Sequence, residues 1–371
     1  MKIYVIAGES SGDLHGAALM KELYALDPSC EIRFYGGDMM ASCGGTMARH
    51  CGNTAVMGFS EVIGKAGAIL DNLSFCKRDI LSFSPDAVIL IDYPGFNLRI
   101  ARFARKNGFR VYYFIPPKVW ARGRRRVSLL RRYTDRVFSI LPFEKDFFLR
   151  YGVPVQYVGN PLVDKVSEHK FTSVGEDSCT IALLPGSRSA ELKFLMPRFA
   201  ALEKLVRADS RFDKYRLLIA ATPSRNESEY LSFLPSDTSI KIISNRTYDI
   251  LKQSDAAVIC SGTASLEAAL IGTPQVVCYG FGTVTYLLAR LLVHGIRYIS
   301  LANLILDKPV FRELIQSEAN PDAMFRELCS LLFDRDVRER MLSDYRELAG
   351  RMGECGAAGR VAAAIVDDCK K

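Results

Sequence analysis

The sequence has few of the features that mark membrane-spanning, disulfide-rich or metal-binding proteins. Its longest nearly apolar run, residues 284–296, is interrupted by Arg290 and His294 and is too short to cross a membrane. The ten cysteines are scattered without the close pairs of a zinc site, and no secretory signal precedes them, so we expect free thiols in a reducing cytoplasm. The four histidines show no metal-ligand spacing, and we expect neither a metal nor a cofactor.

Several common catalytic motifs are also missing. The chain has no Gly-x-Ser-x-Gly elbow and no Gly-x-Gly-x-x-Gly fingerprint, which weakens a hydrolase or dehydrogenase interpretation. Gly58 and Gly64-Lys65 come close to a phosphate-binding loop. One residue too many separates the glycines, however, and Ala66 stands where a hydroxyl would hold magnesium, so we reject that loop.

The length and composition indicate two globular domains. The 371 residues are too many for one core of usual size, and 49% of them are hydrophobic and 24% charged. Short apolar runs alternate with helical patterns, which predicts parallel sheets covered by helices. We expect strands at residues 2–7, 31–36, 84–92, 110–115, 136–141 and 156–158, and in the second half at 180–184, 216–220, 240–243, 256–259 and 275–277.

The predicted fold class is therefore α/β, with two Rossmann-like domains and a ligand cleft between the carboxyl ends of their sheets. We expect the first domain to span residues 1–165 and to be joined by a C-terminal helix at 345–371. The second domain is expected at residues 175–340. Residues 164–178 are polar and without periodicity, which is typical of a linker.

The positive charge of the chain is concentrated in one segment. The net charge is +8, and between residues 118 and 136 only Asp135 opposes eight basic side chains: Lys118, Arg122, Arg124, Arg125, Arg126, Arg131, Arg132 and Arg136. Such a cluster favours an anionic partner, namely nucleic acid, an anionic lipid surface or a phosphorylated substrate. A solubilising helix face is the alternative.

Two turns of the second half are suited to binding an anion. Each follows an apolar strand and opens a helix, so that free backbone N–H groups and the positive end of the helix dipole face a ligand. In the first turn an arginine adds a guanidinium suited to phosphate oxygens. The residues alone leave a purely structural turn open. The candidates for binding are Gly186, Ser187, Arg188, Ser261, Gly262 and Thr263.

Carboxylates follow two strands of the first half. Asp92 could accept a proton from an attacking hydroxyl, or it could cap the following helix. Glu9 has the same position after the first strand. In the second half, Glu267 could accept hydrogen bonds from sugar hydroxyls or be an ordinary solvated glutamate. Further substrate-binding candidates are Ser10, Ser11, Gly12, Asn97 and Asp13, although Asp13 also suits a helix or turn cap.

Taken in order, these segments resemble the lipid-A-disaccharide synthase family, which are GT-B type glycosyltransferases. The resemblance covers most of the chain and weakens over about its last sixty residues. The matching segments are AGESSGD (7–13), AVMGFSEVIG (55–64), LIDYPGFN (90–97), IPPKVWA (115–121), LPFEKDFFLRYGVPVQYVGNPL (141–162), IALLPGSRSAELK (181–193), SGTASLEAAL (261–270) and YISLANLI (298–305).

The resemblance implies a reaction of lipid A biosynthesis. A 2,3-diacylglucosamine would pass from its UDP derivative to the 6-hydroxyl of 2,3-diacylglucosamine 1-phosphate. The products would be a β-1,6-linked disaccharide 1-phosphate and UDP, with inversion at the anomeric carbon and without a metal. The family places acceptor and acyl chains on the first domain and UDP on the second. It also implies a cytoplasmic protein at the inner face of an anionic inner membrane in a Gram-negative cell.

The resemblance also implies roles for single residues. The aspartate and arginine regarded as essential in the family correspond to Asp92 and Arg188, with Glu9 as a further catalytic candidate. Glu267 resembles the glutamate for the uridine ribose and Asn303 an asparagine near the substrates. The chain departs from the family pattern at Pro116, Lys118, Arg122, Asn160 and Gly95, which puts fine acceptor or acyl-chain specificity in doubt.

Two other functions are compatible with these residues. One is a different GT-B enzyme acting on UDP-GlcNAc, such as a 2-epimerase or a muramyl-type transferase. The other is a non-catalytic basic protein of a membrane surface. The paired anion-binding turns and the two strand-end carboxylates argue against a pure binding protein, and we expect no nucleic-acid partner. The sequence leaves a monomer and a homodimer both open.

Overall fold

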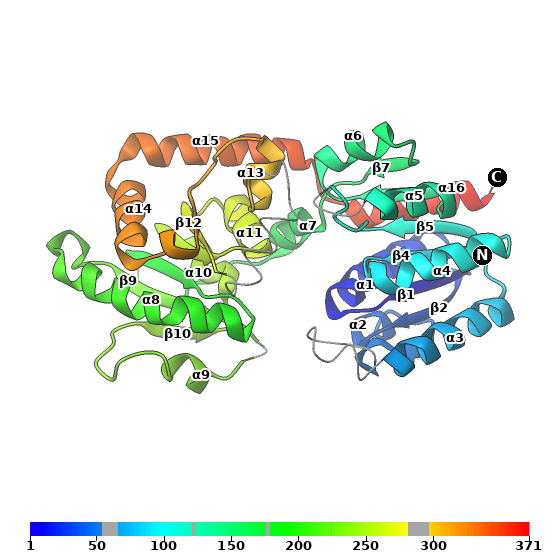
Figure 1. The fold of residues 1–371 in the computed structure, drawn as a ribbon, viewed down its shortest axis with the longest axis horizontal. Coiled ribbons are helices and arrows are strands. Elements are labelled where there is room, and N and C mark those ends of the chain that lie inside the picture. Colours follow the sequence, from blue (N-terminus) through cyan, green and yellow to red (C-terminus); the bar gives the residue numbers. More distant parts are fainter. Residues whose placement is uncertain (54–65, 121–123, 176–178, 224, 281–296, 371) are drawn as a thin grey trace. The chain divides into compact units, whose positions relative to one another are not determined.

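The computed structural model describes residues 1–53, 66–120, 124–175, 179–223, 225–280 and 297–370 (Figure 1). The chain forms two compact units. Unit 1 comprises Met1–Asp164 and Glu354–Lys371, and unit 2 comprises Lys165–Gly353. The rejected phosphate loop at 58–65, the apolar run at 284–296 and Arg122 lie outside the described residues.

Unit 1 is built around a seven-stranded parallel sheet. Its strands are in the order β3-β2-β1-β4-β5-β6-β7. The elements are β1 (Lys2–Ala7), α1 (Ser10–Leu26), β2 (Glu31–Gly36), α2 (Asp38–Ala41), β3 (Thr46–His50), η1 (Cys51–Asn53), α3 (Ala66–Phe83), β4 (Ala87–Ile91), α4 (Pro94–Lys106), β5 (Arg110–Phe114), α5 (Arg124–Tyr133), β6 (Arg136–Ser139), α6 (Pro142–Arg150), β7 (Val155–Tyr157) and α16 (Ala357–Lys370). Helix α7 (Pro161–Glu168) begins in unit 1 and ends in unit 2.

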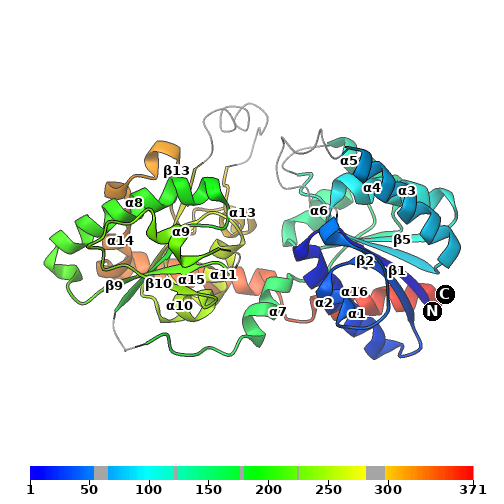
Figure 2. The same cartoon turned by 90° about the horizontal axis from the view of Figure 1, so that it is seen from below.

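The side chains of β1 alternate between two cores, one on each face of this sheet. Tyr4 and Ile6 pack with α3, α4 and α5, whereas Ile3, Val5 and Ala7 pack with α1 and α16. The last helix of the chain therefore lies beside the first one, as both ribbon views show (Figure 2). Because both faces are covered, the central strand β4 (AVILI) is apolar throughout, whereas the edge strand β3 (TMARH) is not.

Unit 2 repeats the architecture with a six-stranded parallel sheet in the order β10-β9-β8-β11-β12-β13. Its apolar core includes side chains of α10 and α11 on one face, and α8 and α14 pack together. The elements are β8 (Thr180–Leu184), α8 (Ser189–Ala208), η2 (Ser210–Phe212), β9 (Arg216–Ala221), α9 (Glu227–Leu231), β10 (Lys241–Ser244), α10 (Thr247–Gln253), β11 (Ala256–Cys260), α11 (Thr263–Ile271), β12 (Gln275–Tyr279), α13 (Leu301–Leu306), β13 (Glu313–Ile315), η3 (Gln316–Glu318), α14 (Pro321–Phe333) and α15 (Arg335–Met352).

The α/β fold class with two Rossmann-like sheets is confirmed, and the differences from expectation are the two unpredicted strands β3 and β13 and several element boundaries. Helix α4 begins at Pro94, four residues before the predicted start, because proline is well tolerated in the first turn of a helix. The segment expected as a linker is helical up to Glu168, where α7 ends. No described helix is long and apolar enough to span a membrane.

Candidate active site

Each sheet has one point at which its strand order reverses, and the candidate residues lie there. In unit 1 the reversal falls between β1 and β4, and in unit 2 between β8 and β11. Open α/β sheets bind their ligands outside the carboxyl ends of the strands at such points. Glu9 and Asp92 follow β1 and β4, whereas Arg188 and Ser261 follow β8 and β11. The structure thus brings the predicted residues together in two groups, one in each unit.

The backbone at Asp92 has a conformation that residues other than glycine rarely adopt. Asp92 and Tyr93 have φ angles of 45° and 47°. The carbonyl oxygen of Asp92 accepts hydrogen bonds from Tyr113 Oη at 2.7 Å and Asn97 Nδ2 at 2.8 Å. The Asp92 N–H donates to Phe114 O at 3.0 Å. These contacts hold the turn in its strained form and fix where the Asp92 side chain begins.

Asn97 therefore has a different role from the one predicted. It was a substrate-binding candidate, but it is fully buried, and its amide nitrogen also donates to Ile91 O at 3.1 Å. Within the described part of the chain its Oδ1 has no hydrogen-bond partner. The side chain supports the Asp92 turn from inside the unit.

Asp92 itself is partly buried beside a second carboxylate. Burial, and then the nearby charge of Glu9, raise the pKa of the Asp92 carboxyl above its usual range. The N–H of Tyr93 and the ammonium of Lys118 act in the opposite direction. A raised pKa makes the carboxylate a stronger proton acceptor, which suits a general base.

A pocket of about 640 Å³ opens at Asp92. Two cations, Lys118 and Arg126, line it together with Asp92 and the prolines of the turn after β5. From the sequence both cations belong to the basic cluster, and Lys118 is also a departure from the family pattern. No spacing in the sequence could have joined them to Asp92, because they meet it across neighbouring strands. The pocket combines a base with positive charge suited to a phosphate.

The turn after β1 supplies the first residues of α1. Ser10 and Ser11 are exposed, and Gly12 packs closely on Ala7. No side chain caps the N-terminus of this helix, so its first N–H groups face the same edge of the sheet as Asp92. These residues remain candidates for contacting a substrate.

Asp13 is a capping residue, which corrects its place among the substrate-binding candidates. Its buried carboxylate accepts hydrogen bonds from the backbone N–H groups of Gly37 at 2.7 Å, Met39 at 3.0 Å and Met40 at 3.1 Å. These are the first N–H groups of α2, and the carboxylate stabilises that helix start.

In unit 2, a carboxylate of the chain itself occupies the turn at Gly186–Arg188. Glu191 Oε2 accepts the N–H groups of Ser187 at 2.9 Å and Arg188 at 3.0 Å. Glu191 Oε1 lies 3.4 Å from Arg188 Nη1. The spacing of three residues between the helix start and a glutamate is the sequence signature of such a cap. A ligand anion cannot use these two N–H groups while Glu191 holds them.

The neighbouring turn at Ser261–Thr263 has the opposite character. No side chain caps the start of α11, and a Cβ at Gly262 would meet nothing within 4 Å. The Arg188 side chain, 81% exposed, is available at the adjacent strand end. The first turn of α11 with Arg188 is therefore the better anion site of this unit.

Glu267 is not the ordinary solvated glutamate that was one of its two interpretations, and its carboxylate already has partners within unit 2. It is buried, and its Oε1 accepts hydrogen bonds from Tyr248 Oη at 2.6 Å and Lys165 Nζ at 3.2 Å. Its ammonium and phenol partners hold the carboxylate one turn into α11. That position keeps it close to the anion site at the start of the same helix.

Asn303 has all its hydrogen-bonding capacity used inside unit 2, which corrects its assignment as a substrate contact. Its Nδ2 donates to Phe311 O and Glu313 Oε1, both at 3.0 Å. Its Oδ1 accepts the N–H groups of Val310 at 2.9 Å and Phe311 at 3.3 Å. The residue fastens α13 to the start of β13. Asn160 is similarly buried and donates to Ile140 O at 3.0 Å.

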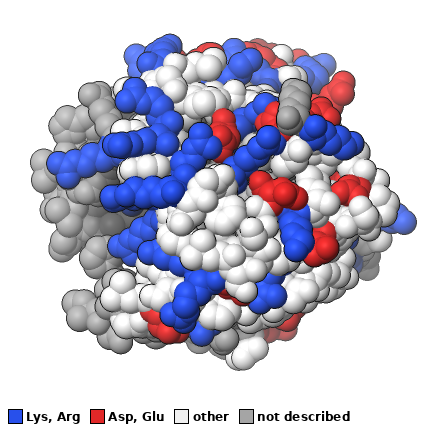
Figure 3. Space-filling model, turned by 90° about the vertical axis from the view of Figure 1, so that its right-hand side faces the viewer, with Lys and Arg blue, Asp and Glu red and all other residues white. Residues whose placement is uncertain are grey.

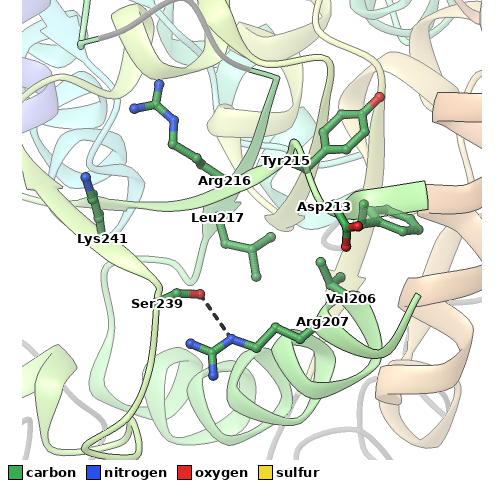
Figure 4. A pocket seen from close by; sticks show the side chains of 9 residues that line it. Val206, Arg207, Asp213, Tyr215, Arg216, Leu217, Ser239 and Lys241 are labelled. Carbon is green, nitrogen blue, oxygen red and sulfur yellow. Dashed lines mark hydrogen bonds between the residues drawn. The ribbon is translucent and has the colours of Figure 1, made fainter. Parts of the chain in front are cut away.

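A second pocket, of about 310 Å³, lies at the opposite edge of the unit 2 sheet, where β9 and β10 begin (Figure 4). Leu217 points into it, with Arg216 and Lys241 on one side. Arg207 is already paired with Ser239 Oγ at 3.2 Å and Glu203 Oε1 at 3.1 Å. Because ligands of such sheets bind at the carboxyl ends, we assign no substrate to this pocket.

Among the described residues no group of three His, Cys, Asp or Glu side chains could hold a metal ion.

The two strand orders and the anion-facing turns define the class of the protein, a two-domain α/β enzyme with the GT-B fold. Solved structures share this fold. The putative UDP-N-acetylglucosamine 2-epimerase of Listeria monocytogenes is 15% identical, with a TM-score of 0.68 over 100% of this chain and 96% of that chain. The UDP-GlcNAc 2-epimerase of Neisseria meningitidis, solved bound to UDP-GlcNAc, is 12% identical, with a TM-score of 0.68 over 99% and 100%.

Sequence relatives identify the family. The family model of lipid-A-disaccharide synthetase matches residues 3–365. The lipid-A-disaccharide synthase of Syntrophus aciditrophicus is 36% identical over 100% of this chain and 98% of the relative, and that of Myxococcus xanthus is 35% identical over 99% and 97%. The chain belongs to the lipid-A-disaccharide synthetase family. This confirms the resemblance and the enzyme class expected from the motifs, a glycosyltransferase of lipid A biosynthesis.

The geometry at Gly186 predicts a large effect of a single methyl group. Gly186 has a φ of 95°, and a Cβ there would lie 2.4 Å from Glu191 Oε2. We expect Gly186→Ala to destabilise the protein by about 1–3 kcal/mol, since it strains the backbone and displaces the capping carboxylate. Gly262→Ala is the matched control, because its Cβ would meet nothing. Urea denaturation measures both, and equal effects would contradict the role of Glu191.

Proposed function

We propose that the chain transfers 2,3-diacylglucosamine from its UDP derivative to the 6-hydroxyl of 2,3-diacylglucosamine 1-phosphate. The family membership supports this choice of substrates, since relatives over the full length are named lipid-A-disaccharide synthases. The observation that carries the mechanism is Asp92, a carboxylate of raised pKa beside two cations in one pocket. Unit 1 takes the acceptor in this proposal, and unit 2 takes the UDP portion of the donor.

Asp92 acts as the general base. Its carboxylate accepts the proton of the acceptor's 6-hydroxyl while that oxygen forms a bond to the anomeric carbon of the donor. The bond from this carbon to the diphosphate oxygen breaks, and its electron pair leaves with UDP. Attack opposite to the leaving group inverts the anomeric carbon and gives the β-1,6 linkage. Lys118 and Arg126 supply positive charge for the 1-phosphate of the acceptor.

The leaving diphosphate is stabilised by the start of α11 and by Arg188. The uncapped N–H groups at Ser261–Thr263 face the developing charge, and the exposed guanidinium of Arg188 adds a permanent positive charge. Gly186 and Ser187 shape the turn that carries Arg188 rather than donating to the ligand, because Glu191 holds that turn. Glu267, on α11, accepts hydrogen bonds from the ribose hydroxyls of the UDP portion.

The membrane interaction rests on a basic surface of unit 1. Arg125, Arg131 and Arg132 of α5 are exposed, whereas Arg136 is turned inward and pairs with Asp368 Oδ1 at 2.9 Å. Lys and Arg side chains predominate over acidic ones on the face drawn in Figure 3. Such a surface would hold the enzyme at the anionic cytoplasmic face of the inner membrane, where its lipid substrates are. The apolar residues 56–63, expected to assist, lie outside the described residues.

The role of Asp92 is tested by its conservative replacement. Asp92→Asn keeps the shape of the side chain but cannot accept the proton, so we expect kcat to fall by about 100- to 10,000-fold. A coupled UDP-release assay with acylated donor and acceptor measures this, and Asp71→Asn, exposed on α3, is the control. Near-normal turnover of the Asp92 variant would refute the base. Release of UDP from unacylated UDP-GlcNAc alone would favour a different GT-B enzyme.

The pH profile tests the electrostatic setting of that base. Glu9→Gln removes a negative charge that raises the pKa of Asp92, so the acid limb of kcat/KM should move to lower pH. Lys118→Met removes a charge that lowers the same pKa, and the limb should move to higher pH. Glu31→Gln, exposed at the start of β2, should leave it in place. Shifts of the same sign in both active-site variants would exclude Asp92 as the titrating base.

Vesicle binding tests the basic surface. Each surface arginine contributes about 1 kcal/mol of attraction to an anionic membrane, so Arg125→Ala, Arg131→Ala and Arg132→Ala together should weaken binding about 100-fold. Sedimentation with vesicles containing phosphatidylglycerol measures this at low salt, and high salt should release the unsubstituted protein. The control is the triple alanine variant at Arg335, Arg340 and Arg346, exposed on α15. Salt-independent binding would contradict the proposal.

A further inference from the structure

The turn after β5 places Lys118 at the Asp92 pocket. The backbone of this turn does not by itself favour the conformation that it adopts. Ile115 has a φ of 59°, which is unfavourable for a β-branched residue. Two prolines follow, so this stretch lacks two of its N–H donors. Val119 is buried, and its N–H donates to Pro117 O at 2.6 Å. The turn therefore needs an anchor beyond Lys118 to keep the ammonium at the pocket.

Trp120 is the anchor at the far end of this turn, and it is fixed by helix α6. Its indole Nε1 donates a hydrogen bond to Glu144 Oε1 at 3.1 Å. Its ring meets the ring of Phe143 edge to face, with centroids 5.1 Å apart. Glu144 is itself 1% exposed, and its Oε2 accepts the Leu141 N–H at 3.3 Å. Burying a carboxylate this deeply costs free energy unless hydrogen bonds or an opposite charge compensate it.

We propose that Glu144 is a positioning residue that acts through Trp120 to hold Lys118 at the Asp92 pocket. The inference rests on the proposed function for its effect on turnover, but the anchor itself can be tested without any substrate. Glu144 and Trp120 lie 24 residues apart in the sequence, and no local pattern connects them.

The charges around the anchor connect it with the base. The ammonium of Lys118 favours the ionised form of both Glu144 and Asp92. A loose turn would remove this charge from both carboxylates and from the phosphate of the acceptor. Loss of the anchor should therefore affect binding of the acceptor and leave binding of the donor unchanged.

Glu144 also titrates at a higher pH than an ordinary glutamate. Burial raises the pKa of its carboxyl to about 7, against the hydrogen bonds from Trp120 and the N–H of Leu141 and the charge of Lys118. Among the described residues, Tyr157 of β7 is a further titratable side chain near Glu144. Because the pKa is raised in the folded protein, the stability that Glu144 contributes is greatest at low pH. This contribution falls as the pH rises from about 4.5 towards about 7.

The fluorescence of the protein reports this anchor alone, because Trp120 is the only tryptophan of the chain. We expect the emission of the unsubstituted protein to change with a midpoint near pH 7. Glu144→Gln keeps an acceptor for the indole N–H but cannot ionise, so this change should disappear while the fold is kept. Asp146→Asn, exposed on the same helix, should retain it. The same titration in Glu144→Gln as in the unsubstituted protein, or none in either, overturns the proposal.

Steady-state kinetics test the effect on the site. Trp120→Phe keeps the ring contact with Phe143 but removes the indole donor, so KM for the acceptor should rise about three- to tenfold, the range for one lost hydrogen bond. KM for the donor should not change. An unaltered acceptor KM overturns the positioning role. If no UDP is formed from the acylated substrates at all, the proposed function fails, whereas the fluorescence result still decides whether the anchor exists.

Discussion

Burial of both faces of a parallel sheet confines polar chemistry to the ends of its strands. In each unit helices cover the sheet on both sides, so a charged side chain on a central strand would have no water and no partner. The carboxyl ends differ because the chain turns there and helix N-termini point outward. Asp92 and Arg188 both stand at such ends, at the reversal of strand order in their own sheet. The two units thus place charged side chains at equivalent points of the same architecture, a carboxylate in unit 1 and a guanidinium in unit 2.

This constraint explains why the central strands could be predicted from the sequence. Strands β1, β2 and β8 have the predicted bounds, because a short apolar run between turn residues is stable as a buried strand of a sheet covered by helices on both faces. The missed strands β3 and β13 are edge strands with polar or partly exposed residues, such as Thr46–His50. An edge strand needs to bury only part of its surface, and its sequence therefore lacks the apolar signal.

The role of a candidate residue could be predicted where it depends on the position of that residue after a strand or in a helix. It could not be predicted where it depends on hydrogen-bond partners that are distant in the sequence. Asp92 could be proposed because it directly follows a strand, and Glu267 because it lies about one turn into the helix after one. The capping of α2 by Asp13 and the fully bonded amide of Asn303 depend on backbone groups up to 27 residues away, which no local pattern reveals. Glu191 could have been found, since its spacing from Arg188 is that of a helix cap. Lys118 could not, because only the pairing of β4 with β5 brings its turn to Asp92.

Glu9 and Lys118 act on the pKa of Asp92 in opposite directions, and a general base needs this balance. Burial and Glu9 both raise the pKa of the carboxyl, and a carboxyl that stays protonated cannot accept a proton. Lys118 alone would lower its pKa and make it a weak base. A balance between these effects depends on where the ammonium is held, and a lysine has a long flexible side chain on a turn that contains two prolines. A fixed backbone limits where that side chain can reach, and the indole–carboxylate contact behind the turn supplies this restraint in our proposal.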